Sequence, residues 1–138
     1  MAHGLVARGL DAGLGGGYCG GRFGGIDAVH FKGFLKHIES RLHLSPIFRQ
    51  KLLRVPLELD YPYWIEDENF DLEYHVRHIA LPKPGDWRQF CIQASRIHAR
   101  ALDLNRPLWE IYVIEGLADG RLGFYSKVHH AAVDGQAA

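Results

Sequence analysis

Two strand-like runs joined by a short turn restrict the fold of this chain more than any other feature. Residues 108–115 and 122–129 are largely apolar, and residues 116–120 between them end in an Asp-Gly pair, which is typical of a hairpin turn. The sequence therefore predicts an antiparallel β-hairpin. Its second strand leads directly into His129 and His130.

Two amphipathic helices are predicted before the hairpin. Asp27 is a candidate cap for the first, and its apolar residues recur three and four positions apart: Phe31, Phe34, Leu35, Ile38 and Leu42. Ser45-Pro46 marks its end. Asp86 is a candidate cap for the second, which has one face formed by Trp87, Phe90, Cys91, Ala94, Ile97 and Ala101. With a strand expected at residues 75–81, the order of elements indicates a mixed α/β domain over residues 26–138.

Composition excludes several classes of function. Sixteen basic residues balance sixteen acidic ones, so nucleic acid is not an expected partner. The two cysteines, Cys19 and Cys91, lie far apart, which indicates a reducing, cytoplasmic setting; Cys91 is expected in the core. No apolar run approaches the roughly 20 residues of a membrane span, whereas peripheral contact with a lipid surface stays open.

Residues 1–25 differ in composition from the rest of the chain. They contain ten of the sixteen glycines, so little side chain is available for burial and disorder is expected. A phosphate-binding loop is the alternative, but the flanking strand and helix and a suitably placed lysine or serine that it requires are not evident.

The histidine pair and the residues after it are candidates for chemistry. Neighbouring residues of a strand point to opposite faces, so only one of His129 and His130 would face a given site, which argues against a metal held by both. A neutral histidine there could act as a general base. Asp134 could orient the imidazole or anchor the loop to an arginine, and Gly135 would permit close approach of the backbone. An ordinary surface turn is the alternative.

These residues also carry a resemblance to a known superfamily. Residues 129–135, HHAAVDG, match the HHxxxDG motif of the CoA-dependent acyltransferases, which include chloramphenicol acetyltransferase and the condensation domains of peptide synthetases. Residues 102–110, LDLNRPLWE, resemble the corresponding segment of the bacterial wax ester synthase/diacylglycerol acyltransferase family, as do residues 46–50, 64–67, 70–72 and 75–77.

The resemblance implies a fold and an activity. The fold would be the N-terminal half of a chloramphenicol acetyltransferase-like domain, with a mixed sheet, packed helices and a hairpin leading into the motif. The activity would be transfer of a fatty acyl group from acyl-CoA, as substrate and without a bound cofactor or metal, to diacylglycerol or a long-chain alcohol. His130 would be the general base, Asp134 would hold the loop, Gly135 would form its turn, and His129 would be the other histidine of the motif, facing away from His130.

The resemblance also implies what lies around the motif. Pro107, Leu108 and Trp109 would line the acyl or alcohol channel or fill the core beneath the catalytic strand, and the core is favoured because a buried tryptophan mostly supplies apolar area.

Family enzymes have a second half after the motif, so these 138 residues are expected to be inactive without a C-terminal half. Peripheral location at the inner membrane or lipid droplets is expected from the insoluble acceptors. A non-catalytic module and a condensation-type enzyme acting on carrier-bound substrates are the alternatives.

Overall fold

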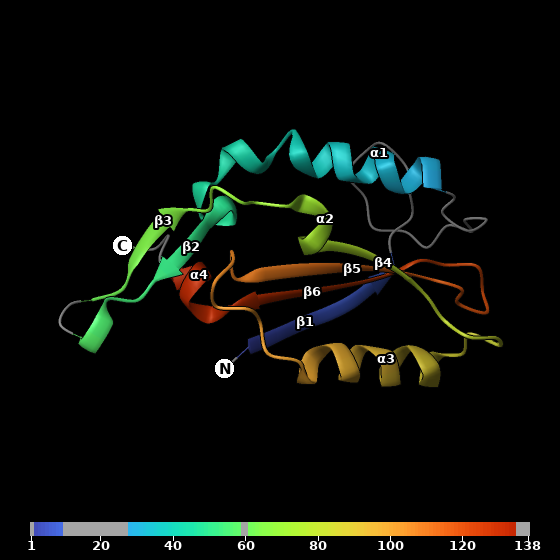
Figure 1. Cartoon of the computed structure of the whole chain (residues 1–138). Helices are drawn as coiled ribbons and strands as arrows, with labels where there is room; N and C mark the ends of the chain where they lie inside the picture. The colour runs from blue at the N-terminus through green and yellow to red at the C-terminus, as the bar shows by residue number, and fades with distance from the viewer. Residues whose placement is uncertain (1, 10–27, 59–60, 135–138) are drawn as a thin grey trace.

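The computed structural model describes residues 2–9, 28–58 and 61–134, with side-chain environments for residues 31–57 and 61–132. Its centre is a four-stranded sheet of order β1-β6-β5-β4, formed by β1 (Ala2–Gly9), β4 (Val76–Ala80), β5 (Trp109–Glu115) and β6 (Gly123–His129). Strands β4 and β5 are parallel, and the other two pairs are antiparallel. Helices α1 (Ala28–Glu39) and α3 (Trp87–Ala99) cover opposite faces of the sheet (Figure 1).

The predicted hairpin is present as β5 and β6. Its register pairs Trp109 with Val128 and Tyr112 with Tyr125. Gly116 and Gly120 adopt positive φ angles of 86° and 74° in the connection, a conformation that glycine adopts without steric cost. The hairpin therefore forms where the Asp-Gly turn predicted it.

Alternating residues of the hairpin build two cores. Tyr112, Ile114 and Tyr125 pack on the α3 side with Leu81, Phe90 and Ile97. Trp109, Ile111 and Val128 pack on the α1 side with Leu42, Val76 and the apolar stripe of α1. Each face of the sheet is thus covered by the apolar side of one helix, and the periodicity of both helices had predicted that each has such a side.

Helix α3 begins as predicted but buries a narrower stripe of residues than predicted. Asp86 forms a capping box with Gln89, whose backbone N–H lies 2.8 Å from the Asp86 carboxylate. Phe90 and Ile97 are buried, whereas Cys91 is exposed. The prediction that Cys91 fills the core was wrong, because a residue adjacent to Phe90 lies about 100° around the helix, beyond the edge of a narrow buried stripe. Trp87 is likewise 61% exposed.

Helix α1 packs through the stripe that the sequence predicted. Phe31, Phe34, Leu35 and Ile38 lie against the α1-side core, while Leu42 joins them from the 3-10 helix η1 (Leu42–Leu44) after α1 has ended at Glu39. A second 3-10 helix, η2 (Pro46–Arg49), begins at the Ser45-Pro46 step. Asp27, the expected cap, lies outside the described residues.

The described N-terminal residues form the edge strand of the main sheet. Ala2–Gly9 is β1, which pairs antiparallel with β6. The first nine residues contain only Gly4 and Gly9, and pairing with them supplies partners for the otherwise open edge of β6. Residues 10–27 lie outside the described part.

A second, two-stranded sheet was not predicted. Strands β2 (Gln50–Leu53) and β3 (Tyr63–Glu66) pair antiparallel and extend to one side of the main sheet, next to α4 (His130–Asp134), with the 3-10 helix η3 (Pro56–Glu58) between them (Figure 1). The Lys51 ammonium lies 2.9 Å from the buried carboxylate of Asp67 and ties β2 to the end of β3. Burial raises the pKa of Asp67, but this hydrogen bond and one from the Asn69 N–H outweigh it and leave the pKa below its usual value.

Candidate active site

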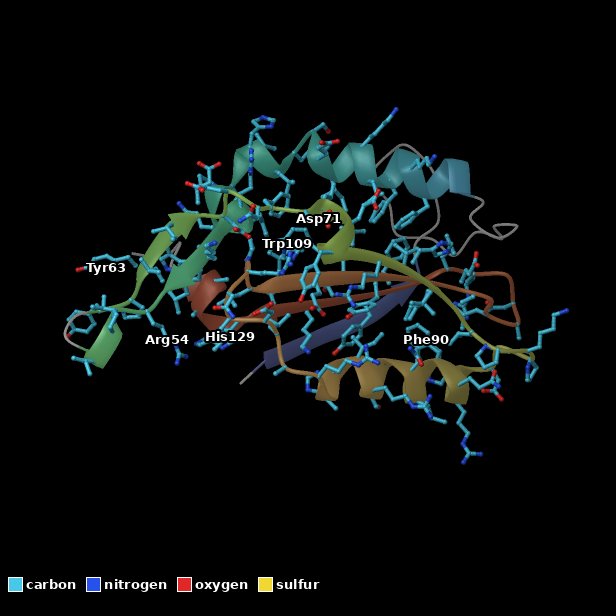
Figure 2. The ribbon with its side chains drawn as sticks, viewed as in Figure 1. Arg54, Tyr63, Asp71, Phe90, Trp109 and His129 are labelled. Carbon is cyan, nitrogen blue, oxygen red and sulfur yellow. The ribbon has the colours of Figure 1, made fainter. Side chains whose placement is uncertain are left out.

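The histidine pair lies at the junction between a strand and a helix. His129 is the last residue of β6, and His130 is the first residue of the five-residue helix α4. His129 is half-buried and labelled in Figure 2 at the end of the sheet that adjoins α4, and His130 is exposed. The strand thus ends between the two histidines, and a short helix follows where a strand opening into a loop was predicted.

The His129 ring forms a hydrogen bond with the backbone two residues later in the chain. Its Nδ1 accepts a hydrogen bond of 3.2 Å from the backbone N–H of Ala131. An acceptor at this position relative to α4 is a helix N-cap, which satisfies one of the N–H groups left free in the first turn. Burial lowers the pKa of His129 below its usual value, so the ring stays a neutral acceptor at neutral pH. His129 is therefore suited to shaping the turn.

The turn is attached to the start of β5. The backbone N–H of His129 donates to the Leu108 carbonyl at 2.9 Å. Ala132, Leu108 and Ile47 form one buried cluster, which joins α4 to β5 and η2. Leu108 is 1% exposed, and Pro107 before it is fully buried. These two residues are buried behind the motif.

Trp109 is buried at the same end of the sheet. It is 3% exposed, its indole N–H donates to the Phe48 carbonyl at 2.8 Å, and its ring stacks on that of His75 with centroids 4.7 Å apart. One edge also borders a small apolar cavity of about 190 Å³ between the end of α1 and Ile111. Trp109 thus packs in the α1-side core and also forms part of a cavity wall.

Glu110 and Lys127 are two buried polar residues near the end of the sheet that carries the motif. Sequence reasoning missed their roles. They oppose each other in the β5–β6 register, and Lys127 is 0% exposed. The Lys127 ammonium donates to the carbonyls of Ile97 and Arg100 at the end of α3, and Glu110 accepts from the Tyr112 hydroxyl at 2.7 Å. The register of the predicted hairpin would have been enough to place these two residues opposite each other.

Burial lowers the pKa of Lys127. Burial also raises the pKa of Tyr112 to about 12, with the hydrogen bond to Glu110 adding to it.

The remaining motif residues are only partly described. Asp134 is the last residue of α4, but its side chain lies outside the described environments, and Gly135 lies outside the described residues. Within the described part, no three histidine, cysteine or acidic side chains lie close enough together to hold a metal ion. No described helix has the length and apolar character required to cross a bilayer.

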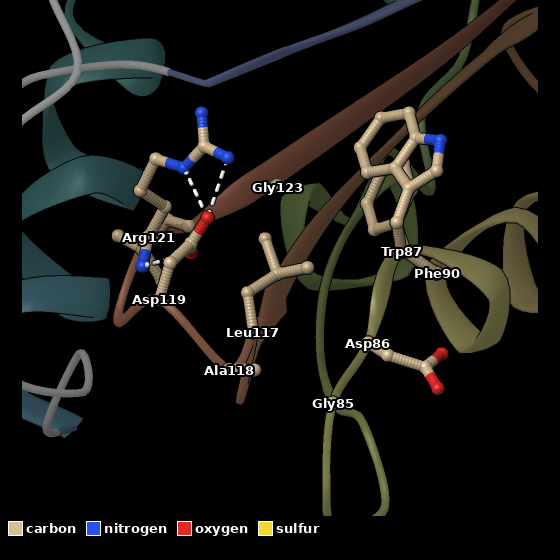
Figure 3. Close-up of a pocket in the computed structure, with 10 residues that line it drawn as sticks. Gly85, Asp86, Trp87, Phe90, Leu117, Ala118, Asp119, Arg121 and Gly123 are labelled. Atoms are coloured by element: carbon tan, nitrogen blue, oxygen red, sulfur yellow. Dashed lines mark hydrogen bonds and ion pairs between the residues drawn. The ribbon is translucent and has the colours of Figure 1, made fainter.

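A further cavity lies away from the motif. It has a volume of about 370 Å³ and lies between the start of α3 and the hairpin turn, with Trp87, Phe90, Leu117 and the paired Asp119 and Arg121 in its wall (Figure 3). Because the hairpin turn and the histidine pair are at opposite ends of β6, this cavity is separate from the candidate catalytic residues.

Comparison with known proteins decides the family. Residues 24–138 match the wax ester synthase/diacylglycerol acyltransferase catalytic domain. The chain belongs to this family. The resemblance carried by the HHxxxDG and LDLNRPLWE segments is thereby confirmed.

Curated relatives agree. The Mycobacterium tuberculosis protein named "Probable diacyglycerol O-acyltransferase tgs3" is 44% identical over 107 residues, which are 78% of this chain and 40% of that protein. The one named "Probable diacyglycerol O-acyltransferase tgs2" is 40% identical over 105 residues, 76% of this chain and 23% of that protein. The chain thus spans less than half the length of these relatives.

Solved structures show the same fold. The wax ester synthase/diacylglycerol acyltransferase from Marinobacter aquaeolei VT8 has a TM-score of 0.68 and 32% identity, over 98% of this chain and 30% of that one. The first condensation domain of the CDA synthetase has a TM-score of 0.54 at 20% identity, over 78% of this chain and 27% of that one, and shows the fold alone. The predicted mixed α/β acyltransferase fold is confirmed.

Proposed function

We propose that this chain carries the general base of an O-acyltransferase, which moves a fatty acyl group from acyl-CoA to diacylglycerol or a long-chain alcohol. The observation that supports this is the exposed position of His130 at the start of α4, immediately after a strand end held from behind by buried contacts, in a chain of the wax ester synthase/diacylglycerol acyltransferase family. The products would be triacylglycerol or a wax ester.

The two histidines would have different roles. His129 uses Nδ1 to cap α4, and its ring is half-buried. His130 is exposed at the first position of α4, where a substrate can approach it. We therefore assign proton transfer to His130 and shaping of the turn to His129, and we keep the expected loop-anchoring role for Asp134.

The proposed reaction is a direct transfer. His130 accepts the proton of the acceptor hydroxyl while that oxygen bonds to the thioester carbonyl carbon, which gives a tetrahedral oxyanion. The oxyanion collapses, the carbon–sulfur bond breaks, and the proton passes from His130 to the departing CoA sulfur. One ester and one free thiol form, and the base is regenerated. General-base help of this kind contributes about 10²–10⁴-fold to the rate.

The chain would supply only part of the enzyme. It covers 30% of the solved wax ester synthase and 40% of tgs3, so we propose that the substrate channel is completed by a C-terminal part and that the 138 residues alone are inactive. The acceptors are insoluble in water, and the proposal places the reaction at a lipid surface contacted peripherally from the cytoplasm.

The test is an acceptor-dependent transfer assay. The 138-residue chain, and the product of its gene including any sequence that continues past residue 138, receive palmitoyl-CoA with diolein, with hexadecanol or with no acceptor. Free thiol is followed and the lipid product is identified by mass spectrometry. Thiol release that requires an acceptor and yields triacylglycerol or wax ester supports the proposal. Release without an acceptor, or none with any acceptor from the longer product, contradicts it.

A further inference from the structure

His75 is a buried histidine that the proposed reaction does not use. It is the last residue of the short helix α2 (Leu72–His75) and is 0% exposed. Its Nδ1 lies 2.7 Å from the carbonyl oxygen of Trp109. Because a carbonyl only accepts, Nδ1 carries the hydrogen and donates it. Nε2 is buried without a hydrogen-bond partner among the described residues.

The ring is fixed by aromatic neighbours. It lies nearly parallel to the ring of Phe70, at a centroid distance of 5.2 Å and an interplanar angle of 12°, and to the ring of Trp109, at 4.7 Å and 22°. Tyr74 meets it edge-on at 5.2 Å. A ring packed against three aromatic rings cannot rotate away from the Trp109 carbonyl without disrupting these contacts. Burial lowers the pKa of His75, so the donor is a neutral imidazole at neutral pH.

The hydrogen bond lies where the strand ladder stops. Strand β4 begins at Val76, which pairs with Ile111, so β4 has no strand residue beside Trp109. Successive carbonyls of a strand point to opposite sides, and the Leu108 carbonyl is bonded to His129 on the β6 side. The Trp109 carbonyl therefore points toward β4, where the His75 side chain supplies the missing donor.

We infer that His75 is a positioning residue for the histidine pair: it holds the start of β5, and Leu108 in turn holds His129 and the first turn of α4. Two contacts of Leu108 transmit this position, namely the hydrogen bond from the His129 N–H and the packing against Ala132. The inference depends on the proposed function only for the catalytic meaning of the pair.

The test uses NMR of the 138-residue chain, so its failure is distinct from failure of the acyl transfer assay. Long-range ¹H–¹⁵N spectra of the unsubstituted chain should show His75 protonated at Nδ1 and bare at Nε2. In His75→Leu, the His129 amide should exchange with solvent at least about 10-fold faster relative to the core amides of β5 and β6, as expected for loss of support worth about one hydrogen bond. In His75→Asn, whose amide can donate from nearly the same place, exchange should return to within about 3-fold.

His78→Leu is the matched control, because His78 lies on β4 but contacts Phe31 and Glu115 instead of the start of β5. Two results would overturn the inference. One is a His75 ring protonated at Nε2 in the unsubstituted chain, a reading that does not depend on any variant folding. The other is a His129 amide that responds to His75→Leu no more than to His78→Leu, or that His75→Asn does not restore.

Discussion

Two histidines with lowered pKa values make the free energy of unfolding depend on pH. The pKa of His75 is lowered from 6.5 mainly by burial; Trp109, Glu110 and Asp67 oppose that shift, and Arg106 adds to it. The pKa of His129 is lowered in the same direction by burial. For each histidine, at pH values between its pKa in the folded chain and its higher pKa in the unfolded chain, the unfolded chain binds more protons than the folded chain. Folding is therefore favoured as pH rises.

The free energy of unfolding should consequently fall as pH is lowered. The contribution of His75 is fully present above about pH 6.5 and is lost as pH drops through that value toward the lowered pKa. Urea unfolding at pH 7.5, 6.5 and 5.5 measures this. His75→Asn should reduce the slope, whereas His43→Asn, at an exposed position, should leave it unchanged. An equal slope in all three chains would contradict the assignment.

A buried lysine and glutamate are a second feature at the scale of single residues. Replacing Lys127 with Met leaves the last carbonyls of α3 without their donor and Glu110 without its opposite charge. Leaving buried carbonyls without their donor costs about 1–3 kcal/mol of unfolding free energy. In urea unfolding, Lys127→Met with Glu110→Gln should lose less than the sum of the two single changes. Strict additivity would show that the two side chains do not interact.

At the scale of elements, close packing between α3 and the hairpin depends on one glycine. A Cβ added to Gly123 would collide with the ring of Phe90, whereas one added to Gly33 in α1 meets nothing within 4 Å. Helix α3 therefore lies as near to β6 as the absent side chain permits.

Gly123→Ala should destabilise the chain by about 1–3 kcal/mol, because Phe90 or the helix must shift. Gly33→Ala should instead stabilise it by about 0.5–1 kcal/mol, since alanine is preferred inside a helix. Thermal unfolding of the two variants makes the comparison. Similar effects of the same sign would mean that the contact between Phe90 and Gly123 is not tight.

Sequence patterns predicted the elements whose signal is local. The Asp86 cap, the α1 stripe and the Asp-Gly hairpin all depend on residues within a few positions of one another. Features that depend on distant partners were missed or misplaced. The parallel pairing of β4 with β5 and the β2–β3 sheet join segments through connections without a recognisable turn, and the exposure of Cys91 depends on how α3 is rotated against the sheet.

The same division holds for the site. The motif itself identified His129 and His130, and the burial of Leu108 and Trp109 followed the expected packing. The capping role of His129 could not be predicted, because it requires the strand to end and a helix to begin between the two histidines. The support from His75 depends on a hydrogen bond across 34 positions of sequence, which no local pattern encodes.

At the scale of the whole molecule, the described part is a scaffold that presents the exposed His130 of the motif. A mixed sheet between two helices, with a buried cluster behind α4, holds the start of that helix in place. Family membership is shown by the match over residues 24–138, and the proposed reaction requires His130 as its base.

The measurement that tests this most directly is the rate of CoA thiol release from palmitoyl-CoA with the preferred acceptor, by the longest product of the gene. The unsubstituted protein is compared with His130→Ala and with His43→Ala, a change at an exposed histidine outside the motif. We expect His130→Ala to lower the rate at least about 10²-fold and His43→Ala to leave it unchanged. A folded His130→Ala protein that transfers acyl groups at the unsubstituted rate would contradict the assignment of His130 as the base.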